Sequence, residues 1–355
     1  MARILIKGGR VWDGDRFFFS DVLCEGGRVA SISEKISVDA DHVYDASGKT
    51  VCAGFVDAHV HMRGISIDKY GISAEMSCLP FGVTAAADAS GVKGDAALLD
   101  SFGVKGTVFV EAPIENNRPL LSITEAGLAR FGDRAVGVKV YFDTEVSGVE
   151  NAEPLIEICK FARERGLRVM VHSSHSPIPM AELLDTLSEG DILTHAYHGG
   201  RNNSSEDAFE ALKAAKARGV VIDAGFAGHV HTDFGVFREA IKSSAFPNVI
   251  STDVTRLSSY VRGGRYGMTL CMSIARHLGM NEEDIFRAVT SAPAKALGKT
   301  DEWGSLAVGR AADIAVIEYT DERFDLTDGA GNRVCSDKGY RCVLTVVDGQ
   351  IVYKD

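Results

Sequence analysis

The sequence predicts an α/β fold, a (β/α)8 TIM barrel joined to a small β-sandwich that both ends of the chain build. Between residues 53 and 300, eight short apolar runs of strand length alternate with amphipathic runs of helical period. In residues 1–52 and 301–355, short β-like runs are separated by Gly-Gly and Asp-Gly pairs. A chain of 355 residues, 45% hydrophobic and 25% charged, has the length and composition for such a barrel.

The two terminal segments share one texture, which indicates a single small β domain. Residues 1–52 contain the runs ARILIKGGRV, DVLCEGGRVASI and HVYDASGKTV, and residues 301–355 contain SLAVGRAADIAVIE and VLTVVDGQIVYKD. None of these runs has helical periodicity, and their glycine pairs are typical of hairpin turns. We therefore expect these segments to form the two parts of the β-sandwich, with the barrel at 53–300 between them.

Eight apolar runs are the candidate barrel strands, and their spacing leaves room for a helix after each one. Two of the intervening runs, residues 152–166 and 205–219, are amphipathic and end at a glycine, where a helix C-cap belongs. The candidate strands are residues 54–60, 82–87, 107–112, 135–142, 168–172, 191–195, 219–224 and 248–253.

Polar residues interrupt these strands near their carboxyl ends, where barrels of this kind carry their chemistry. His59 and His61 end the first strand two positions apart, so both side chains point to the same face. One such residue alone would be interpreted as a hydrogen-bonded core histidine. Six at matching strand ends indicate a common site, because burying unpaired polar groups is costly. The six are His59, His61, Lys139, His172, His195 and Asp253.

The chemistry of this set points to metal ions. Imidazole and carboxylate ligands suit zinc and similar divalent ions. The first histidine pair and Asp253 could hold one ion, and His172 and His195 a second. Lys139 fits such a site as a carbamate, because a desolvated lysine loses its proton and the neutral amine can add carbon dioxide. The alternative for Lys139 is a structural ion pair within the barrel.

Several of these motifs resemble those of a known family. GFVDAHVH resembles the first-strand motif of the amidohydrolase superfamily, and GVKVY, VMVHSS, LTHAYH and STD resemble its lysine, histidine and aspartate strands. AVTSAPAKALG followed by GSLAVGRAADIAVIE is similar to the segment by which the family leaves the barrel. The resemblance covers almost the whole chain and is to the binuclear-metal branch, with dihydroorotase-like and hydantoinase-like members. It implies two divalent ions, expected to be Zn²⁺, a carbamate on Lys139, and ligand roles for all six residues.

The resemblance also implies a reaction. Two ions would lower the pKa of a shared water toward about 7, and Asp253 would accept its proton and pass it to the departing nitrogen. We therefore expect a hydrolase that cleaves the C–N bond of a small, carboxylate-bearing amide, either cyclic or N-acylated. An esterase of a small acylated carboxylic acid is the alternative on the same site. A mononuclear deaminase would lack the strand-four lysine, and a non-catalytic barrel protein would have lost ligands.

Substrate contacts are expected on the loops around this site. Arg63 lies where dihydroorotase-like proteins have an arginine for the substrate carboxylate, although the following Gly64 departs from their Arg-x-Pro pattern. The arginine-rich segment after Asp253 includes Arg256 and adds positive charge that suits an anionic group; surface arginines are the alternative. Histidines that follow the sixth and seventh strands could donate to a developing oxyanion. The candidate contacts are Arg63, His198, His229, His231, Tyr260, Arg262 and Arg265.

Charge and composition indicate which classes of partner and which cellular compartment to expect. A formal net charge of −11 argues against binding nucleic acid through a general basic surface. Seven scattered cysteines do not suggest a disulfide framework. The start, MARILIKGG, lacks the apolar core of a signal peptide, and no run reaches membrane-spanning length. We expect a cytoplasmic homo-oligomer that acts on a small molecule, with no nucleic-acid or membrane partner.

Overall fold

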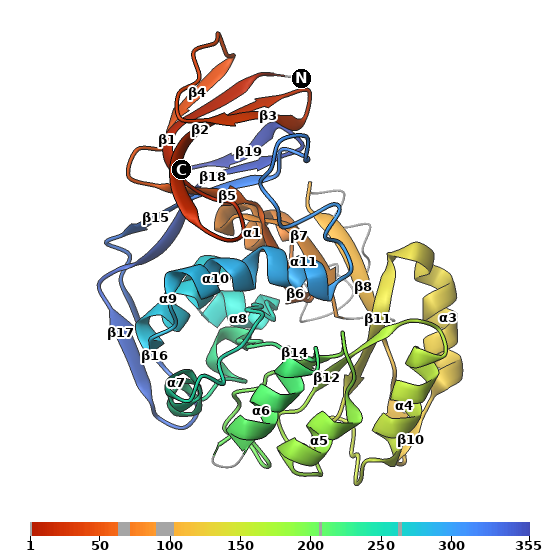
Figure 1. Ribbon diagram of the computed structural model, residues 1–355. Coiled ribbons are helices and arrows are strands. Elements are labelled where there is room, and N and C mark those ends of the chain that lie inside the picture. Colours follow the sequence, from red (N-terminus) through yellow and green to blue (C-terminus); the bar gives the residue numbers. More distant parts are fainter. Residues whose placement is uncertain (1, 63–71, 90–102, 206–207, 262–264) are drawn as a thin grey trace.

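A curled parallel sheet forms the barrel and lies below the terminal β domain in Figure 1. The computed structural model describes residues 2–62, 72–89, 103–205, 208–261 and 265–355. Seven barrel strands follow one another in the order β14-β13-β12-β11-β8-β7-β6, and they overlap seven of the predicted strands. Their bounds are β6 (Phe55–Val60), β7 (Val83–Asp88), β8 (Lys105–Glu111), β11 (Ala135–Tyr141), β12 (Arg168–His172), β13 (Ile192–Thr194) and β14 (Val221–Ile222).

The predicted eighth strand at 248–253 is not a regular strand, although this segment occupies its place in the ring. Val249 forms an isolated parallel bridge with Asp223, just after β14, and Val254 forms one with the last residue of β6. The prediction of a strand was wrong because the backbone N–H of Ile250 donates to the carbonyl oxygen of Ala288, and that of Thr252 donates to the Asp57 carboxylate, so neither joins a continuous ladder. The two bridges nevertheless close the barrel between its first and seventh strands.

Helices follow the strands and lie on the outside of the sheet (Figure 1). In α4, Leu155, Ile158, Cys159 and Ala162 are buried at helical spacing, and the chain turns away at Gly166 with a φ of 66°. The α-helices are α1 (Ala74–Ser77), α3 (Leu121–Phe131), α4 (Glu153–Arg163), α5 (Met180–Thr186), α6 (Ala208–Ala217), α7 (Phe234–Lys242), α8 (Arg256–Val261), α9 (Met268–Leu278), α10 (Glu282–Val289) and α11 (Ser291–Ala296). Short elements are the 3₁₀ helices Leu79–Phe81, Gly132–Arg134 and Ala227–His229 and the strand pair β9 (Ile114–Glu115) and β10 (Arg118–Pro119).

Both ends of the chain build one mixed sheet of eight strands, as the sequence predicted. The order is β19-β18-β15-β5-β1-β2-β3, with β4 paired to β1. The two ends join where β15 pairs antiparallel with β5, with Ile314 opposite Ala53. The strands are β1 (Ile4–Trp12), β2 (Phe17–Glu25), β3 (Arg28–Ser33), β4 (His42–Asp45), β5 (Thr50–Ala53), β15 (Ile314–Thr320), β18 (Gly339–Val347) and β19 (Gln350–Lys354).

Aromatic and ionic contacts fix this terminal sheet to the barrel. The ring of Phe17 on β2 meets that of Phe286 on α10 edge-on, with centroids 5.4 Å apart. At the start of β8, Lys105 Nζ lies 2.6 Å from Asp313 Oδ2 and 2.8 Å from Asp348 Oδ1. Since Asp313 is buried, this ion pair is shielded from solvent on one side and anchors the amino-terminal end of the barrel strand.

A hairpin between β15 and β18 of the terminal sheet extends to the helices of the barrel. Its strands, β16 (Phe324–Thr327) and β17 (Arg333–Ser336), lie beside α7 and α9 (Figure 1). In its turn, the buried Asp328 accepts a hydrogen bond of 2.7 Å from the backbone N–H of Phe234, the first residue of α7. Among the described helices, none combines the length and the apolar character that crossing a membrane requires.

Candidate metal centre

The six predicted ligands come together at the carboxyl ends of the barrel strands. All six are buried. His59 lies within β6 and His172 ends β12, while His195 directly follows β13. Ring centroids of His59 and His195 are 5.2 Å apart, and those of His172 and His195 are 4.6 Å apart. Residues more than 100 positions apart in sequence therefore surround one point.

A first group of donors consists of His59, His61 and Asp253. Nε2 of His61 lies 2.8 Å from Oδ1 of Asp253, and Nε2 of His59 lies 3.3 Å from the same oxygen. One ligand atom from each residue lies within 4.8 Å of the other two. Two imidazole nitrogens and a carboxylate oxygen at this spacing form a donor set that suits a divalent ion.

Lys139 lies against this first group. Its side chain is fully buried, and its Nζ is 3.3 Å from Nε2 of His59. Burial lowers the pKa of the Lys139 ammonium to about 8, because the charged form loses its hydration, although Asp253 opposes this shift. A substantial share of neutral amine near pH 8 follows, which carbamate formation requires.

A second group of donors consists of His172, His195 and His231, whose ligand atoms also lie within 4.8 Å of one another. His231 was predicted to be a substrate contact. The structure brings its ring to centroid distances of 4.9 Å from His172 and 4.4 Å from His195. His231 therefore lies with His172 and His195 inside the site rather than on the loops around it.

Hydrogen bonds behind the site fix which ring nitrogen of His59 faces its centre. The Thr194 hydroxyl donates to Oδ2 of Asp223 over 2.7 Å, so its oxygen can accept a bond from Nδ1 of His59, 3.0 Å away. Nδ1 then carries the proton, and Nε2 presents a lone pair toward Lys139 and Asp253. Such outer partners orient imidazole ligands in metal sites.

The two strand-end histidines of the second group are oriented in the same way. Nδ1 of His195 donates to the carbonyl oxygen of Gly225 over 2.6 Å, and Nε2 of His172 lies 3.2 Å from Oδ2 of Asp143. These bonds leave Nε2 of His195 and Nδ1 of His172 with lone pairs for a ligand. Nε2 of His195 is buried and has no hydrogen-bond partner among the described residues. Because buried polar atoms are almost always satisfied, a bound cation fits this atom.

Two of the ligands have a left-handed backbone, with φ of 60° at His195 and 48° at Asp253. Non-glycine residues adopt this conformation at a cost of about 1–3 kcal/mol, and such strain concentrates at functional sites. The barrel therefore holds both side chains in place against a local backbone preference.

The charge of Asp253 is set by its neighbours. Burial alone would raise the pKa of its carboxyl, but the nearby imidazoles of His59 and His61 hold that pKa well below its usual range. Asp253 is therefore an anion beside His59 and His61. Its negative charge adds to the affinity of the first group for a cation.

Acidic residues that were not predicted from the sequence lie behind the ligands. Asp143 lies two positions after β11 and is buried, and it accepts hydrogen bonds from His172 and from the backbone N–H of His175. Burial opposes its charge, but the bond from His172 and those from the backbone N–H groups of Glu145 and Val146 hold the pKa of Asp143 well below its usual range. Asp223 follows β14 in the same manner. An aspartate directly after an apolar strand-like run was the available signal.

His198 is a further buried imidazole of this region. Its Nδ1 accepts a hydrogen bond of 3.1 Å from the backbone N–H of Gly200, so the proton is on Nε2. Nε2 has no partner among the described residues, and burial lowers the pKa of His198 to about 3. The residue is a neutral donor with one unused N–H group.

Several predicted substrate contacts cannot be placed from the described part of the chain. Arg63 and Arg262 lie outside the described residues, and so do the side chains of His229 and Tyr260. Arg265 is described and lies elsewhere. It lines a cavity of about 460 Å³ between α9, the terminal sheet and the β16–β17 hairpin.

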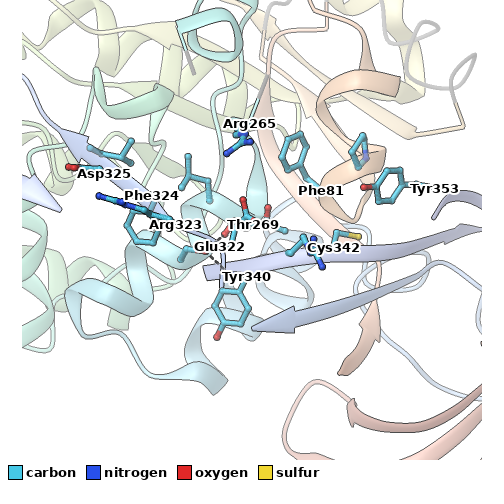
Figure 2. Close-up of a pocket in the computed structure, with 15 residues that line it drawn as sticks. Phe81, Arg265, Thr269, Glu322, Arg323, Phe324, Asp325, Tyr340, Cys342 and Tyr353 are labelled. Atoms are coloured by element: carbon cyan, nitrogen blue, oxygen red, sulfur yellow. Dashed lines mark hydrogen bonds between the residues drawn. The ribbon is translucent and has the colours of Figure 1, made fainter. Parts of the chain in front are cut away.

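Figure 2 shows this cavity, with Phe81 beside Arg265, Thr269 below them and Tyr340 lowest in the view. None of the six predicted metal ligands is among its lining residues. Arg265 therefore lines a cavity other than the metal centre.

Comparisons with known proteins agree with this geometry. The profile of the amidohydrolase family matches residues 50–352. A deacetylase of Enterococcus faecalis is 26% identical over 98% of this chain and 98% of its own. A dihydroorotase of Syntrophotalea carbinolica is 24% identical over 99% of both chains.

Solved structures have the same fold. A dihydroorotase structure superposes with a TM-score of 0.86 at 23% identity, over the full length of both chains. An adenine deaminase structure gives a TM-score of 0.84 at 24% identity over 99% of both chains. The family profile covers most of the sequence, and the donor groups lie where a barrel of this kind has its site. This chain therefore belongs to the amidohydrolase family and is a hydrolase of carbon–nitrogen bonds.

Proposed function

We propose that this chain binds two zinc ions and hydrolyses the C–N bond of a small, carboxylate-bearing amide, cyclic or N-acylated. The observation that carries the proposal is the convergence of unprotonated ring nitrogens on one point. Outer hydrogen bonds direct the lone pairs of His59, His172 and His195 to the centre of the site. Asp253 adds an anionic oxygen, and Lys139 a buried amine.

The first group, His59, His61 and Asp253, would hold one ion, and His172 and His195 the other. Lys139 would join the two as a carbamate. Its neutral amine adds carbon dioxide, forming an N–C bond and releasing one proton, and the two oxygens of the product share one negative charge. The buried position of Lys139 beside His59 supports this assignment, because an ammonium there would repel both ions.

Bound divalent ions would supply Lewis acidity, which lowers the pKa of water toward about 7 and polarises a carbonyl group. The Asp253 carboxylate belongs to the first group, where it can accept the proton of the attacking water. It can then donate that proton to the departing nitrogen, which is a poor leaving group until it is protonated. His198, with its unused Nε2–H, is a candidate donor to the developing oxyanion.

The substrate class is supported by the relatives as well as by the site. Those that match along most of this chain are named deacetylases and dihydroorotases, which suggests an N-acyl or cyclic amide. Recognition of its carboxylate is assigned to Arg63 and Arg262. The name deacetylase does not distinguish amides from esters, so an esterase on the same site is a separate outcome of the test.

Metal analysis combined with matched substrates tests the proposal. The purified protein should contain about two zinc ions per chain, and a chelator should remove activity that zinc restores. N-Acetyl amino acids, hydantoins and dihydropyrimidines would be compared with acetyl esters of the corresponding hydroxy acids. Full activity with one ion would refute the two-ion site, and turnover of esters alone would reassign the enzyme as an esterase.

A further inference from the structure

We propose that His231 is a seventh metal ligand, the third imidazole on the ion that His172 and His195 hold. The inference rests on the proposed two-ion site and extends it by a residue outside the six predicted ligands. It makes the two halves of the site unlike: the first group has two imidazoles and a carboxylate, and the second group has three imidazoles.

The packing of the rings supports ligation rather than contact with a substrate. The plane of the His231 ring is inclined by 86° to that of His172 and by 39° to that of His195. The rings are therefore not stacked, and their in-plane nitrogens approach one another to within 4.8 Å. A substrate group does not fit between atoms this close, whereas an ion with ligands at about 2.1 Å does.

A hydrogen bond selects the nitrogen that His231 offers. Nδ1 of His231 lies 2.9 Å from Oγ of Ser174, which occupies that side of the ring. The other nitrogen, Nε2, is left for the ion. Ser174 comes two positions after His172, so one short segment after β12 both supplies a ligand and orients its neighbour. Partners of this kind are what ligating histidines use.

The backbone that delivers His231 is tightly held. Gly225 has a φ of 53°, and a Cβ atom on it would lie 2.6 Å from Nδ1 of His195, so this turn packs directly on a ligand. Ala227 follows with a φ of 46°, and its N–H donates to the carbonyl oxygen of Thr252 over 2.9 Å. The turn that fixes His195 therefore also directs the chain that carries His231 back into the site.

Three neutral imidazoles on one ion are a donor set that catalytic zinc sites use, with a further position open for water or substrate. Without His231, the second ion would have two imidazoles and one carbamate oxygen from this chain. With it, both ions have three donors apart from the shared carbamate. The proposed ligand thus equalises the number of protein donors on the two ions.

Zinc titration of the metal-free protein against a competing chelator tests the inference, with His231→Gln compared with wild type. The affinity for the second ion should fall by more than about 100-fold, because losing a residue that only orients a ligand already costs about 10–100-fold. Ser174→Ala should weaken the second ion by about 10–100-fold. His277→Gln, on the exposed side of α9, is the matched control and should bind both ions as wild type does.

The outcomes separate this inference from the proposed function. A wild-type protein that binds fewer than two ions would refute the two-ion site itself. A wild type with two ions and a His231→Gln variant of equal affinity for both would overturn the ligand assignment. If that variant fails to fold, a zinc-loaded crystal of wild type decides: Nε2 of His231 should lie about 2.1 Å from the second ion, and a distance beyond bonding contact would overturn the assignment.

Discussion

The side-chain amide of Asn332 donates a hydrogen bond of 3.0 Å to Oδ1 of Asp233, although the two residues are 99 positions apart. Asp233 caps α7 by accepting bonds from the backbone N–H groups of Gly235 and Val236. The same carboxylate therefore links the C-terminal hairpin to the helix that begins three positions after His231. The hairpin thus supports one wall of the metal centre from outside the barrel.

Removing the buried carboxylate of this hairpin should destabilise the protein. Asp328 accepts hydrogen bonds from the backbone of Phe234 and from both the backbone and side chain of Asn332. Asp328→Ala leaves these donors unpaired, so the free energy of unfolding should fall by about 1–3 kcal/mol, measured by urea denaturation. Asp337→Ala, an exposed residue of the same region, is the control and should change it by less than about 0.5 kcal/mol. Equal losses of unfolding free energy in the two variants would show that the hydrogen bonds of Asp328 do not stabilise the protein.

Loss of Lys139 should dismantle the shared part of the site. Lys139→Ala removes the only residue proposed to contact both ions, so metal content should drop below two per chain, measured by elemental analysis. Acetate or propionate should partly restore metal and activity, because a free carboxylate can occupy the place of the carbamate. Lys160→Ala, an exposed lysine of α4, should have no such effect. Retention of two ions and full activity by Lys139→Ala would contradict the carbamate assignment.

Asp253→Asn should separate acid–base catalysis from metal binding. The amide keeps a ligand oxygen but cannot carry the proton, so turnover should fall by about 10²–10⁴-fold, the usual range for general acid–base catalysis. Metal content should change little. Steady-state assays with the identified amide substrate measure the change in kcat. Near wild-type turnover would assign the proton transfer to another group, with His229 as the next candidate.

The arginines should differ in their effect on charged substrates. Arg63→Met and Arg262→Met should each lower kcat/KM by about 10–100-fold on a carboxylate-bearing substrate, since a charge-assisted hydrogen bond contributes about 1.5–3 kcal/mol. An uncharged analogue should lose far less. Arg265→Met is the matched control, because Arg265 lines the separate cavity (Figure 2). Equal losses on both substrates would indicate misfolding, and no loss would refute carboxylate recognition.

The hydrogen bonds that link His59 through the Thr194 hydroxyl to the Asp223 carboxylate should raise the affinity for metal. Thr194→Val keeps the side-chain volume but removes the acceptor for Nδ1 of His59. Zinc affinity should fall by about 10–100-fold, as for other outer partners of ligating histidines. Thr107→Val is a matched control in β8, because its buried hydroxyl has no partner among the described residues. Equal zinc affinities for the two variants would remove this role from Thr194.

Much of the barrel and of its site could be predicted because both are encoded in short segments. His59, His61, His172 and His195 each lie at the end of an apolar run, and parallel strands end on the same side of a barrel. Strand order and helix placement then bring them together without further information. The same argument located Lys139, which lies within β11.

The remaining features depend on contacts between segments that have no signature of their own. His231 reaches the cluster only because three left-handed residues, Gly225, Ala227 and Gly228, fold its loop inward. Arg265 was expected at the rim of the site, but it lines another cavity. The irregular eighth segment likewise reflects hydrogen bonds of its backbone to the carbonyl oxygen of Ala288 and the carboxylate of Asp57, which periodicity does not report. Zinc and the carbamate on Lys139 stay predictions.

At His195 and Asp253, the left-handed backbone favours glycine, whereas the metal centre requires a ligand side chain. Glycine adopts such a conformation without steric cost, so a glycine at either position would relieve local strain in the fold. It would also remove a ligand. Mutational drift under selection for folding alone should therefore erode these two positions early, and a homologue with glycine or asparagine there has exchanged catalysis for stability.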